Sequence, residues 1–116
     1  RGGSAIDAAE AGVNALELDT SEQTYVGYGG LPNAEGDMEF DAAIMDGRMC
    51  RYGAVLALQG VKRAVSVARL VMEKSVHNVL AGAGALKFAI SNGMAKEDTL
   101  THEAKREWAE WLLTQP

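Results

Sequence analysis

The residues of greatest chemical interest form a glycine-rich segment, Val26-Gly27-Tyr28-Gly29-Gly30. Glycine reaches positive φ and carries no side chain, so this segment must turn sharply or let another group approach its backbone. A second extended run, residues 38–45, leads to Asp46-Gly47, a turn signal. Two interpretations follow: a hairpin whose glycines only relieve crowding, or a loop that borders a reaction site.

Two carboxylates, Asp41 and Asp46, flank the second run and could serve acid–base chemistry or bind a metal ion. Residues an odd number of positions apart on a strand point to opposite faces, so these side chains should not converge. A metal site would also need more ligands than this pair. We interpret Asp46 as a turn residue and Asp41 as a buried hydrogen-bond acceptor or ion-pair partner, and we predict no metal site and no cofactor.

The other candidate bases and nucleophiles do not combine into a catalytic set. His77 and His102 are the only histidines, and Cys50 is the only cysteine. We expect His77 to be a satisfied core residue, His102 to be the exposed start of the last helix, and Cys50 to lie in a strand as a small buried apolar group. A single cysteine excludes an internal disulfide bond and a cysteine-based metal cage.

Two further patterns favour structural roles. Gly82-Ala83-Gly84-Ala85 resembles a phosphate-binding loop, but no Lys or Ser/Thr stands at the required spacing, which favours a tight strand-to-helix turn. Trp108 and Trp111 are interpreted as core or interface anchors rather than a sugar-stacking platform.

Composition limits the classes of partner. The formal net charge of −5 counts against nucleic acid, because phosphate binding needs clustered Lys and Arg. The longest apolar run, residues 54–58, is far shorter than the roughly 20 residues that cross a bilayer, so no membrane span is expected. At 47% hydrophobic and 23% charged residues, the 116-residue chain has the composition of a folded domain.

Periodicity predicts the elements that position these residues. Ser4 is a suitable N-cap and Asp7 completes a capping-box pattern, so a helix should begin there and end near Glu17. Small apolar residues line one side of this helix and should let it lie close to a sheet: Ala5, Ala8, Ala9, Gly12, Val13 and Leu16. Strands are expected at 24–28, 38–45 and 49–59, the last two joined by a two-residue turn, Asp46-Gly47.

The second half of the chain reads mainly as helices. Residues 54–58 are apolar on both sides, which predicts a strand covered on both faces. A helix over 61–74 should bury one side, formed by Val61, Ala64, Val65, Ala68, Val71 and Met72. A short strand or connector at 75–80, a helix over 85–91 that stops at Asn92-Gly93, and a last helix from about Thr101 complete an α+β domain.

Together these motifs resemble the α-subunit region of glycosylasparaginases, which are N-terminal-nucleophile (Ntn) amidohydrolases. The blocks that carry the resemblance span residues 2–8, 26–30, 41–47 and 67–85, and it extends to residues 107–112. The resemblance implies that residues 1–116 form a single partial domain. That domain would be the α-chain half of an αββα sandwich, incomplete without the β chain.

The same resemblance implies where the chemistry lies. Members of the family cut their own precursor before a threonine, which becomes the nucleophile at the start of the β chain, so no catalytic residue is expected in this chain. The loop Tyr25, Val26, Gly27, Tyr28, Gly29 and Gly30 should lie near that nucleophile. Relatives have a small polar residue where this chain has Tyr25. Either the backbone shifts by one residue and Thr24 takes that place, or self-cleavage and turnover are impaired. Asp98-Thr99 mimics the cut site, but cleavage there would leave a β chain of only residues 99–116, too short to build a pocket.

The implied reaction is hydrolysis of the N-acetylglucosamine–asparagine amide bond by an (αβ)2 assembly, with small glycosylasparagine or asparagine substrates. The bacterial branch resembles the chain more closely, which implies a periplasmic or cytoplasmic location; eukaryotic relatives are lysosomal. Isoaspartyl peptidases and L-asparaginases share the fold but read Asn-Ala-Gly-x-Gly at the glycine segment, unlike residues 25–29 here. A non-catalytic remnant that acts only as a structural partner is the remaining alternative.

Overall fold

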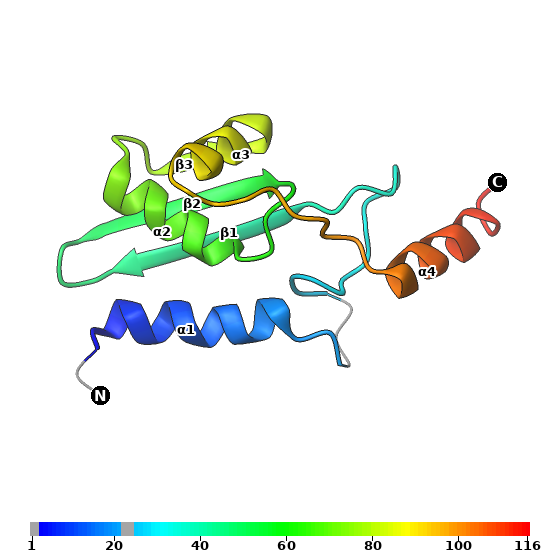
Figure 1. Cartoon of the computed structure of the whole chain (residues 1–116), viewed down its shortest axis with the longest axis horizontal. Coiled ribbons are helices and arrows are strands. Elements are labelled where there is room, and N and C mark those ends of the chain that lie inside the picture. The colour runs from blue at the N-terminus through cyan, green and yellow to red at the C-terminus, as the bar shows by residue number, and fades with distance from the viewer. Residues whose placement is uncertain (1–2, 22–24) are drawn as a thin grey trace.

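The computed structural model describes residues 3–21 and 25–116, and it combines helices with a small sheet (Figure 1). In chain order the elements are α1 (Ala5–Leu18), β1 (Phe40–Asp46), β2 (Arg51–Leu58), α2 (Ala64–Lys74), β3 (Val79–Ala81), α3 (Gly82–Ser91) and α4 (His102–Leu112). This mixed composition confirms the predicted α+β class. No helix in the described ranges is long and apolar enough to cross a membrane.

Helix α1 begins as predicted, with a reciprocal capping box. The Asp7 amide donates to Ser4 Oγ at 3.2 Å, and the Ser4 amide donates to Asp7 Oδ2 at 3.1 Å. Each bond satisfies a backbone donor that the first helical turn leaves free. Local sequence is therefore sufficient to start this helix.

The side of α1 that faces the rest of the fold is not the predicted one. Val13 and Leu16, from the predicted small-residue side, are exposed, whereas Glu10 and Asn14 hydrogen-bond to Ser66 of α2. Arg69 of α2 also contacts α1, with Nη1 2.7 Å from both Asp7 Oδ1 and Glu10 Oε2. Because these bonds orient the polar side of α1 toward α2, the small-residue side does not lie on the described sheet.

The sheet has the order β1-β2-β3, with β1 and β2 antiparallel and β2 and β3 parallel. The turn between β1 and β2 contains residues 47–50 rather than the predicted two residues, and Cys50 adopts a φ of 48°. Asp46 Oδ1 accepts hydrogen bonds from the amides of Arg48 and Met49, which confirms its turn role. The expectation of a buried Cys50 in a strand is wrong, because this longer turn carries it into solvent.

A β-bulge near the start of β1 depends on Asp41. Phe40 pairs with Leu58 and Ala42 pairs with Val55, so two β2 residues lie opposite the single residue between. One of these two, Ala57, has a φ of 50°, and its amide donates to Asp41 Oδ1 at 2.8 Å. Asp41 is thus the predicted hydrogen-bond acceptor, but it is exposed rather than buried.

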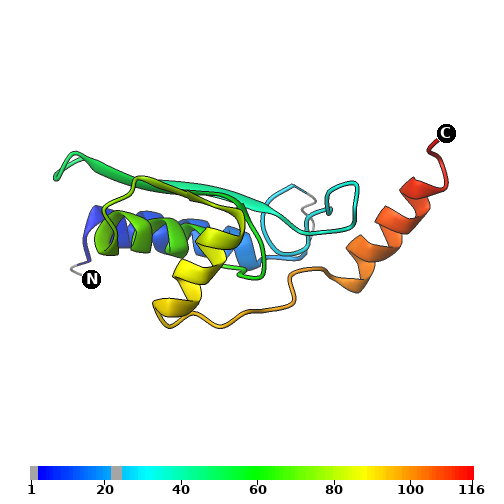
Figure 2. The ribbon, with the colours of Figure 1, turned by 90° about the horizontal axis from the view of Figure 1, so that it is seen from above.

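The apolar core lies between the helices and one face of the sheet, and Figure 2 shows α1, α2 and α3 on the same side of the β1–β2 hairpin. Helix α2 approaches β2 so closely at Gly53 that a Cβ there would lie 2.1 Å from the Ala68 carbonyl oxygen. The predicted α2 side is buried throughout, although the helix begins at Ala64 rather than at 61. Burial of this apolar side supplies most of the folding free energy of such a layer.

The other face of the sheet is uncovered within the described residues. Its register places Met45 beside Tyr52, and Leu56 beside Ala81, on one surface. Met45 is 69% exposed and Leu56 is 48% exposed. The prediction that 54–58 is covered on both faces is therefore wrong for the described chain, because α1, α2 and α3 all pack on one side.

Candidate functional site

The glycine-rich loop at residues 25–30 is a series of bends and turns, so the prediction of a strand over 24–28 is wrong for its described residues; Thr24 lies outside them. Gly27 and Gly29 have φ values of 67° and 98°, which are left-handed rather than extended. The Gly30 amide donates to the Gly27 carbonyl at 3.1 Å. A strand needs a neighbouring ladder to satisfy its backbone groups, whereas here the Gly30 amide bonds within the loop and the Tyr28 amide bonds to the end of α1.

Gly27 packs directly on the end of α1. A Cβ at this position would lie 2.5 Å from the Glu17 carbonyl oxygen and 2.6 Å from Glu17 Cα. The same carbonyl accepts a hydrogen bond from the Tyr28 amide at 2.8 Å. Positive φ and close backbone approach therefore both require glycine here, which confirms the sequence interpretation of this residue.

Glu17 is a residue of this region that sequence reasoning missed. Its side chain is buried, with 4% of the residue exposed, and Oε1 accepts from the Val65 amide at 2.8 Å. That amide belongs to the first turn of α2, whose N-cap residue Arg63 makes no capping side-chain bond in the described part of the chain. Burial raises the pKa of the Glu17 carboxyl, and the bond from Val65 opposes this effect.

Glu17 also carries a buried oxygen, Oε2, that has no hydrogen-bond partner among the described residues. The sequence signal was available, since Glu17 continues the spacing of Glu10 and Asn14 along the polar side of α1. This carboxylate joins the end of α1 to the start of α2, directly behind the glycine-rich loop.

A second support reaches the same loop from the connector between β2 and α2. The Lys62 ammonium lies 4.0 Å from the centroid of the Tyr28 ring. The Lys62 amide donates to Glu97 Oε1 at 3.2 Å, and the Glu97 amide donates to the Gly60 carbonyl at 2.7 Å. No local sequence pattern predicts these contacts, because they join three separate connectors.

A hollow of about 330 Å3 opens beside the loop, lined by Val13, Glu17, Tyr25, Val26, Gly27, Glu39, Phe40, Asp41, Ala42, Ala43, Ala64 and Val65. It combines the first half of the glycine loop, the start of β1 and the first turn of α2. Tyr25 is 93% exposed, so its phenol extends into solvent at the edge of this hollow. In this hollow, the predicted loop residues Tyr25, Val26 and Gly27 lie beside the buried residue Glu17.

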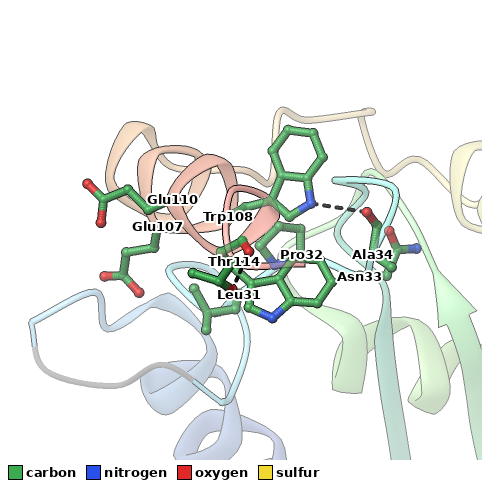
Figure 3. A pocket seen from close by; sticks show the side chains of 9 residues that line it. Leu31, Pro32, Asn33, Ala34, Glu107, Trp108, Glu110 and Thr114 are labelled. Carbon is green, nitrogen blue, oxygen red and sulfur yellow. Dashed lines mark hydrogen bonds between the residues drawn. The ribbon is translucent and has the colours of Figure 1, made fainter. Parts of the chain in front are cut away.

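The two tryptophans lie elsewhere, at a cleft between α4 and the loop at 31–36 (Figure 3). Trp108 Nε1 donates to the Ala34 carbonyl at 3.2 Å, and its ring covers Gly36, where a Cβ would lie 2.8 Å from the ring. Trp108 is therefore an anchor, as predicted, that attaches α4 to this loop. Trp111 lines the same cleft but is 44% exposed.

The remaining candidates are dispersed. His77 is exposed in the connector between α2 and β3, so its predicted core position is wrong; its backbone is held by Ser75 Oγ, and the core is filled by other side chains. His102 is the exposed first residue of α4, as predicted. Thr99, in the rejected cut-site mimic, is buried. Within residues 3–21 and 25–116, no group of three or more His, Cys, Asp or Glu side chains could hold a metal ion.

Fold and site together define a mixed α/β unit that presents a rigidly supported glycine-rich loop and an uncovered apolar sheet face. Comparison with known proteins then specifies the family. The sequence model of the asparaginase family matches residues 1–115, and the chain belongs to this family.

Relatives in this family carry more than one name. The chain is 48% identical over 114 residues to N(4)-(β-N-acetylglucosaminyl)-L-asparaginase of Elizabethkingia miricola, and 42% identical over 111 residues to the rat protein of that name. It is 45% identical over 108 residues to a rat isoaspartyl peptidase/L-asparaginase. These alignments cover 98%, 96% and 90% of this chain, but only 33%, 32% and 32% of the respective relatives. The chain thus spans about a third of the length of the relatives it matches.

Proposed function

We propose that this chain is the α-subunit portion of an amidohydrolase that cleaves the bond between N-acetylglucosamine and asparagine. The observation that carries the proposal is the Tyr25–Gly30 loop, with Gly27 packed on Glu17 and Tyr28 bonded to the same carbonyl. A loop supported in this way offers bare backbone at a constant position, which suits one wall of a reaction site.

The uncovered sheet face supports the proposal that residues 1–116 are a single partial domain. Its exposed apolar side chains include Met45 and Leu56, and such patches on a sheet call for a covering layer. In the αββα sandwich of an Ntn hydrolase, a second sheet from the β chain would cover this face. The two thirds of the relatives that the chain does not match have room for such a layer.

The proposed chemistry belongs to a threonine at the start of that β chain, released by self-cleavage of one precursor. Its hydroxyl attacks the side-chain amide carbonyl of the substrate, and its own α-amino group takes the proton. Hydrogen-bond donors hold the negative oxygen of the tetrahedral intermediate, the amino sugar leaves, and water hydrolyses the β-aspartyl ester to free aspartate. Residues 25–30 of this chain shape the wall beside the nucleophile, in an (αβ)2 assembly.

A second candidate activity is hydrolysis of isoaspartyl peptides or of asparagine itself. It is favoured by the 45% identity to the rat isoaspartyl peptidase/L-asparaginase. Against it, the loop reads Tyr25-Val26-Gly27-Tyr28-Gly29 rather than Asn-Ala-Gly-x-Gly. The third possibility, a non-catalytic remnant, predicts a full-length protein that stays uncut.

One experiment separates these candidates. The full-length protein is purified, its chains are sized and sequenced from their amino ends, and glycosylasparagine, an isoaspartyl dipeptide and asparagine are supplied as substrates. We expect two chains, the second beginning with threonine, and a higher kcat/KM for glycosylasparagine than for the other two. A preference for the isoaspartyl dipeptide would favour the second candidate, and an uncut, inactive protein would refute both activities.

A further inference from the structure

Lys62 and Tyr28 form a contact that the proposed chemistry does not yet use. The Lys62 ammonium lies 4.0 Å from the centroid of the Tyr28 ring, a distance at which the ring quadrupole attracts a cation. Tyr28 lies in the middle of the glycine-rich loop, and Lys62 lies 34 positions further along the chain. The contact therefore holds the loop from outside its own sequence neighbourhood.

The base of Lys62 is itself held in place. Its amide donates to Glu97 Oε1 at 3.2 Å, and the Glu97 amide donates to the Gly60 carbonyl at 2.7 Å. These two bonds join the connector between β2 and α2 to the segment that follows α3, and they hold that connector in place. Because the Lys62 backbone is already held, less conformational entropy is lost when the ammonium packs over the Tyr28 ring.

Tyr28 is held from two directions. Its amide donates to the Glu17 carbonyl at 2.8 Å, while its ring lies under the Lys62 ammonium. The hydrogen bond from the Tyr28 amide restrains the backbone. The contact between the ring and Lys62 restrains rotation of the residue about that hydrogen bond. Gly27 and Gly29 on either side give the backbone wide freedom, so a side-chain restraint on Tyr28 adds to the backbone contacts in selecting one loop conformation.

We propose that Lys62 is a positioning residue for the glycine-rich loop, acting through the Tyr28 ring; its effect on turnover rests on the amide hydrolysis proposed above. Misplacement of a site wall lowers the rate of the chemical step more than it weakens substrate binding, because the reacting atoms lose alignment. Lys62 should therefore affect kcat more than KM. A residue that only stabilised the fold would change neither value in the folded enzyme.

The test uses the full-length protein and four variants. Lys62→Met removes the charge and keeps the apolar stem, Lys62→Arg keeps a cation that also stacks on rings, Tyr28→Leu removes the ring, and Lys87→Met removes an exposed lysine of α3 as the matched control. We expect Lys62→Met to lower kcat about fivefold, with KM changed less than about twofold, because a surface cation–π contact has that size. Lys62→Arg should recover most of kcat, and Lys87→Met should match the wild type.

Combining Lys62→Met with Tyr28→Leu tests whether the lysine acts through the ring. In the Tyr28→Leu background, Lys62→Met should have almost no further effect on kcat. Equal effects of Lys62→Met in both backgrounds would overturn the proposal. So would a loss in Lys62→Met that Lys87→Met reproduces.

Hydrogen exchange provides a readout that does not require activity. Peptides covering residues 25–31 should exchange about fivefold faster in Lys62→Met, with no change in Lys62→Arg or in peptides from α1. If the wild type does not hydrolyse glycosylasparagine, the proposed function fails, and the exchange rates alone decide whether Lys62 holds the loop. Unchanged exchange in Lys62→Met would overturn the positioning role whatever the activity.

Discussion

Replacing Gly27 by alanine is the sharpest test of how the glycine-rich loop is held. Gly27 has a φ of 67°, and an alanine Cβ would lie 2.5 Å from the Glu17 carbonyl oxygen. A left-handed conformation costs an L-residue on the order of 1–2 kcal/mol. The clash can be relieved only by moving the loop away from α1, which breaks the Tyr28–Glu17 hydrogen bond, a loss of about 1 kcal/mol.

The smaller unfolded-state entropy of alanine offsets roughly 0.4–1 kcal/mol of this cost, so we expect Gly27→Ala to lower the free energy of unfolding by about 1–2.5 kcal/mol. Equilibrium urea unfolding of the full-length protein measures this loss. Gly47→Ala is the matched control, because a Cβ there meets nothing within 4 Å and its φ is not positive. The control should be neutral or slightly stabilising.

Gly27→Asn separates the two costs. Asparagine tolerates the left-handed region, so it should recover about 1 kcal/mol of the loss, while its Cβ still meets the Glu17 carbonyl. If Gly27→Ala unfolds at the wild-type urea concentration, the loop is not held by its contact with α1. Complete recovery in Gly27→Asn would refute the steric part of the reasoning.

Four other outcomes are expected. Burial raises the pKa of Glu17 above its ordinary value of 4.5, so the free energy of unfolding of the wild type should fall as the pH rises from 4.5 through the raised pKa. Glu17→Gln, which keeps an acceptor for Val65, should then gain stability relative to wild type, and unfolding curves from pH 4 to 7 test this. Hydrogen bonding by Arg69 lowers the pKa of Asp7 below its ordinary value of 3.8. The ionised Asp7 therefore stabilises the fold above pH 3.8, and this contribution is lost as the pH falls through the lowered pKa. It should be smaller in Arg69→Met, which acid unfolding of the variant and the wild type would measure. Tyr25→Ser in the full-length protein should speed self-cleavage or turnover, by placing a small hydroxyl beside the proposed nucleophile, while Tyr25→Phe changes little; slower rates in both would mean that the phenol itself contributes. The isolated 116-residue chain should hydrolyse neither glycosylasparagine nor asparagine and should associate through its apolar sheet face, whereas a monomer by sedimentation or measurable turnover would contradict this.

Features that depend on near neighbours in the chain could be predicted from sequence. The Ser4–Asp7 capping box starts α1, Thr101 accepts from the Ala104 amide at the start of α4, and α3 stops at Asn92 before Gly93, which has a φ of 93°. Each involves groups within four residues of one another, so the side chains and backbone carry the whole interaction. The buried side of α2 could also be predicted from the sequence, because helical periodicity alone places its apolar residues together.

The glycine-rich loop shows why the site could be read only in part. Its composition correctly indicated positive φ and close backbone approach, but not that α1 would be the element approached. The strand prediction failed because strand and turn differ in their hydrogen-bond partners, and those partners depend on what lies beside the segment. A buried Cys50 and a core His77 were wrong for a related reason, since burial depends on the path of the whole chain.

Tertiary structure alone decided how the loop is supported. Glu17 meets Val65 across 48 positions of sequence, and Lys62 meets Tyr28 across 34. Such contacts arise only after α1, α2 and the connectors have packed. Periodicity places Glu17 on the polar side of α1, but it does not identify Val65 as the partner, and no local pattern links Lys62 to Tyr28. The sequence by itself therefore determined the helices, the two strands of the hairpin and the need for glycine in the loop. Packing determined which groups support the loop, because the Lys62 charge and the Tyr28 ring interact only when the fold brings them close in space.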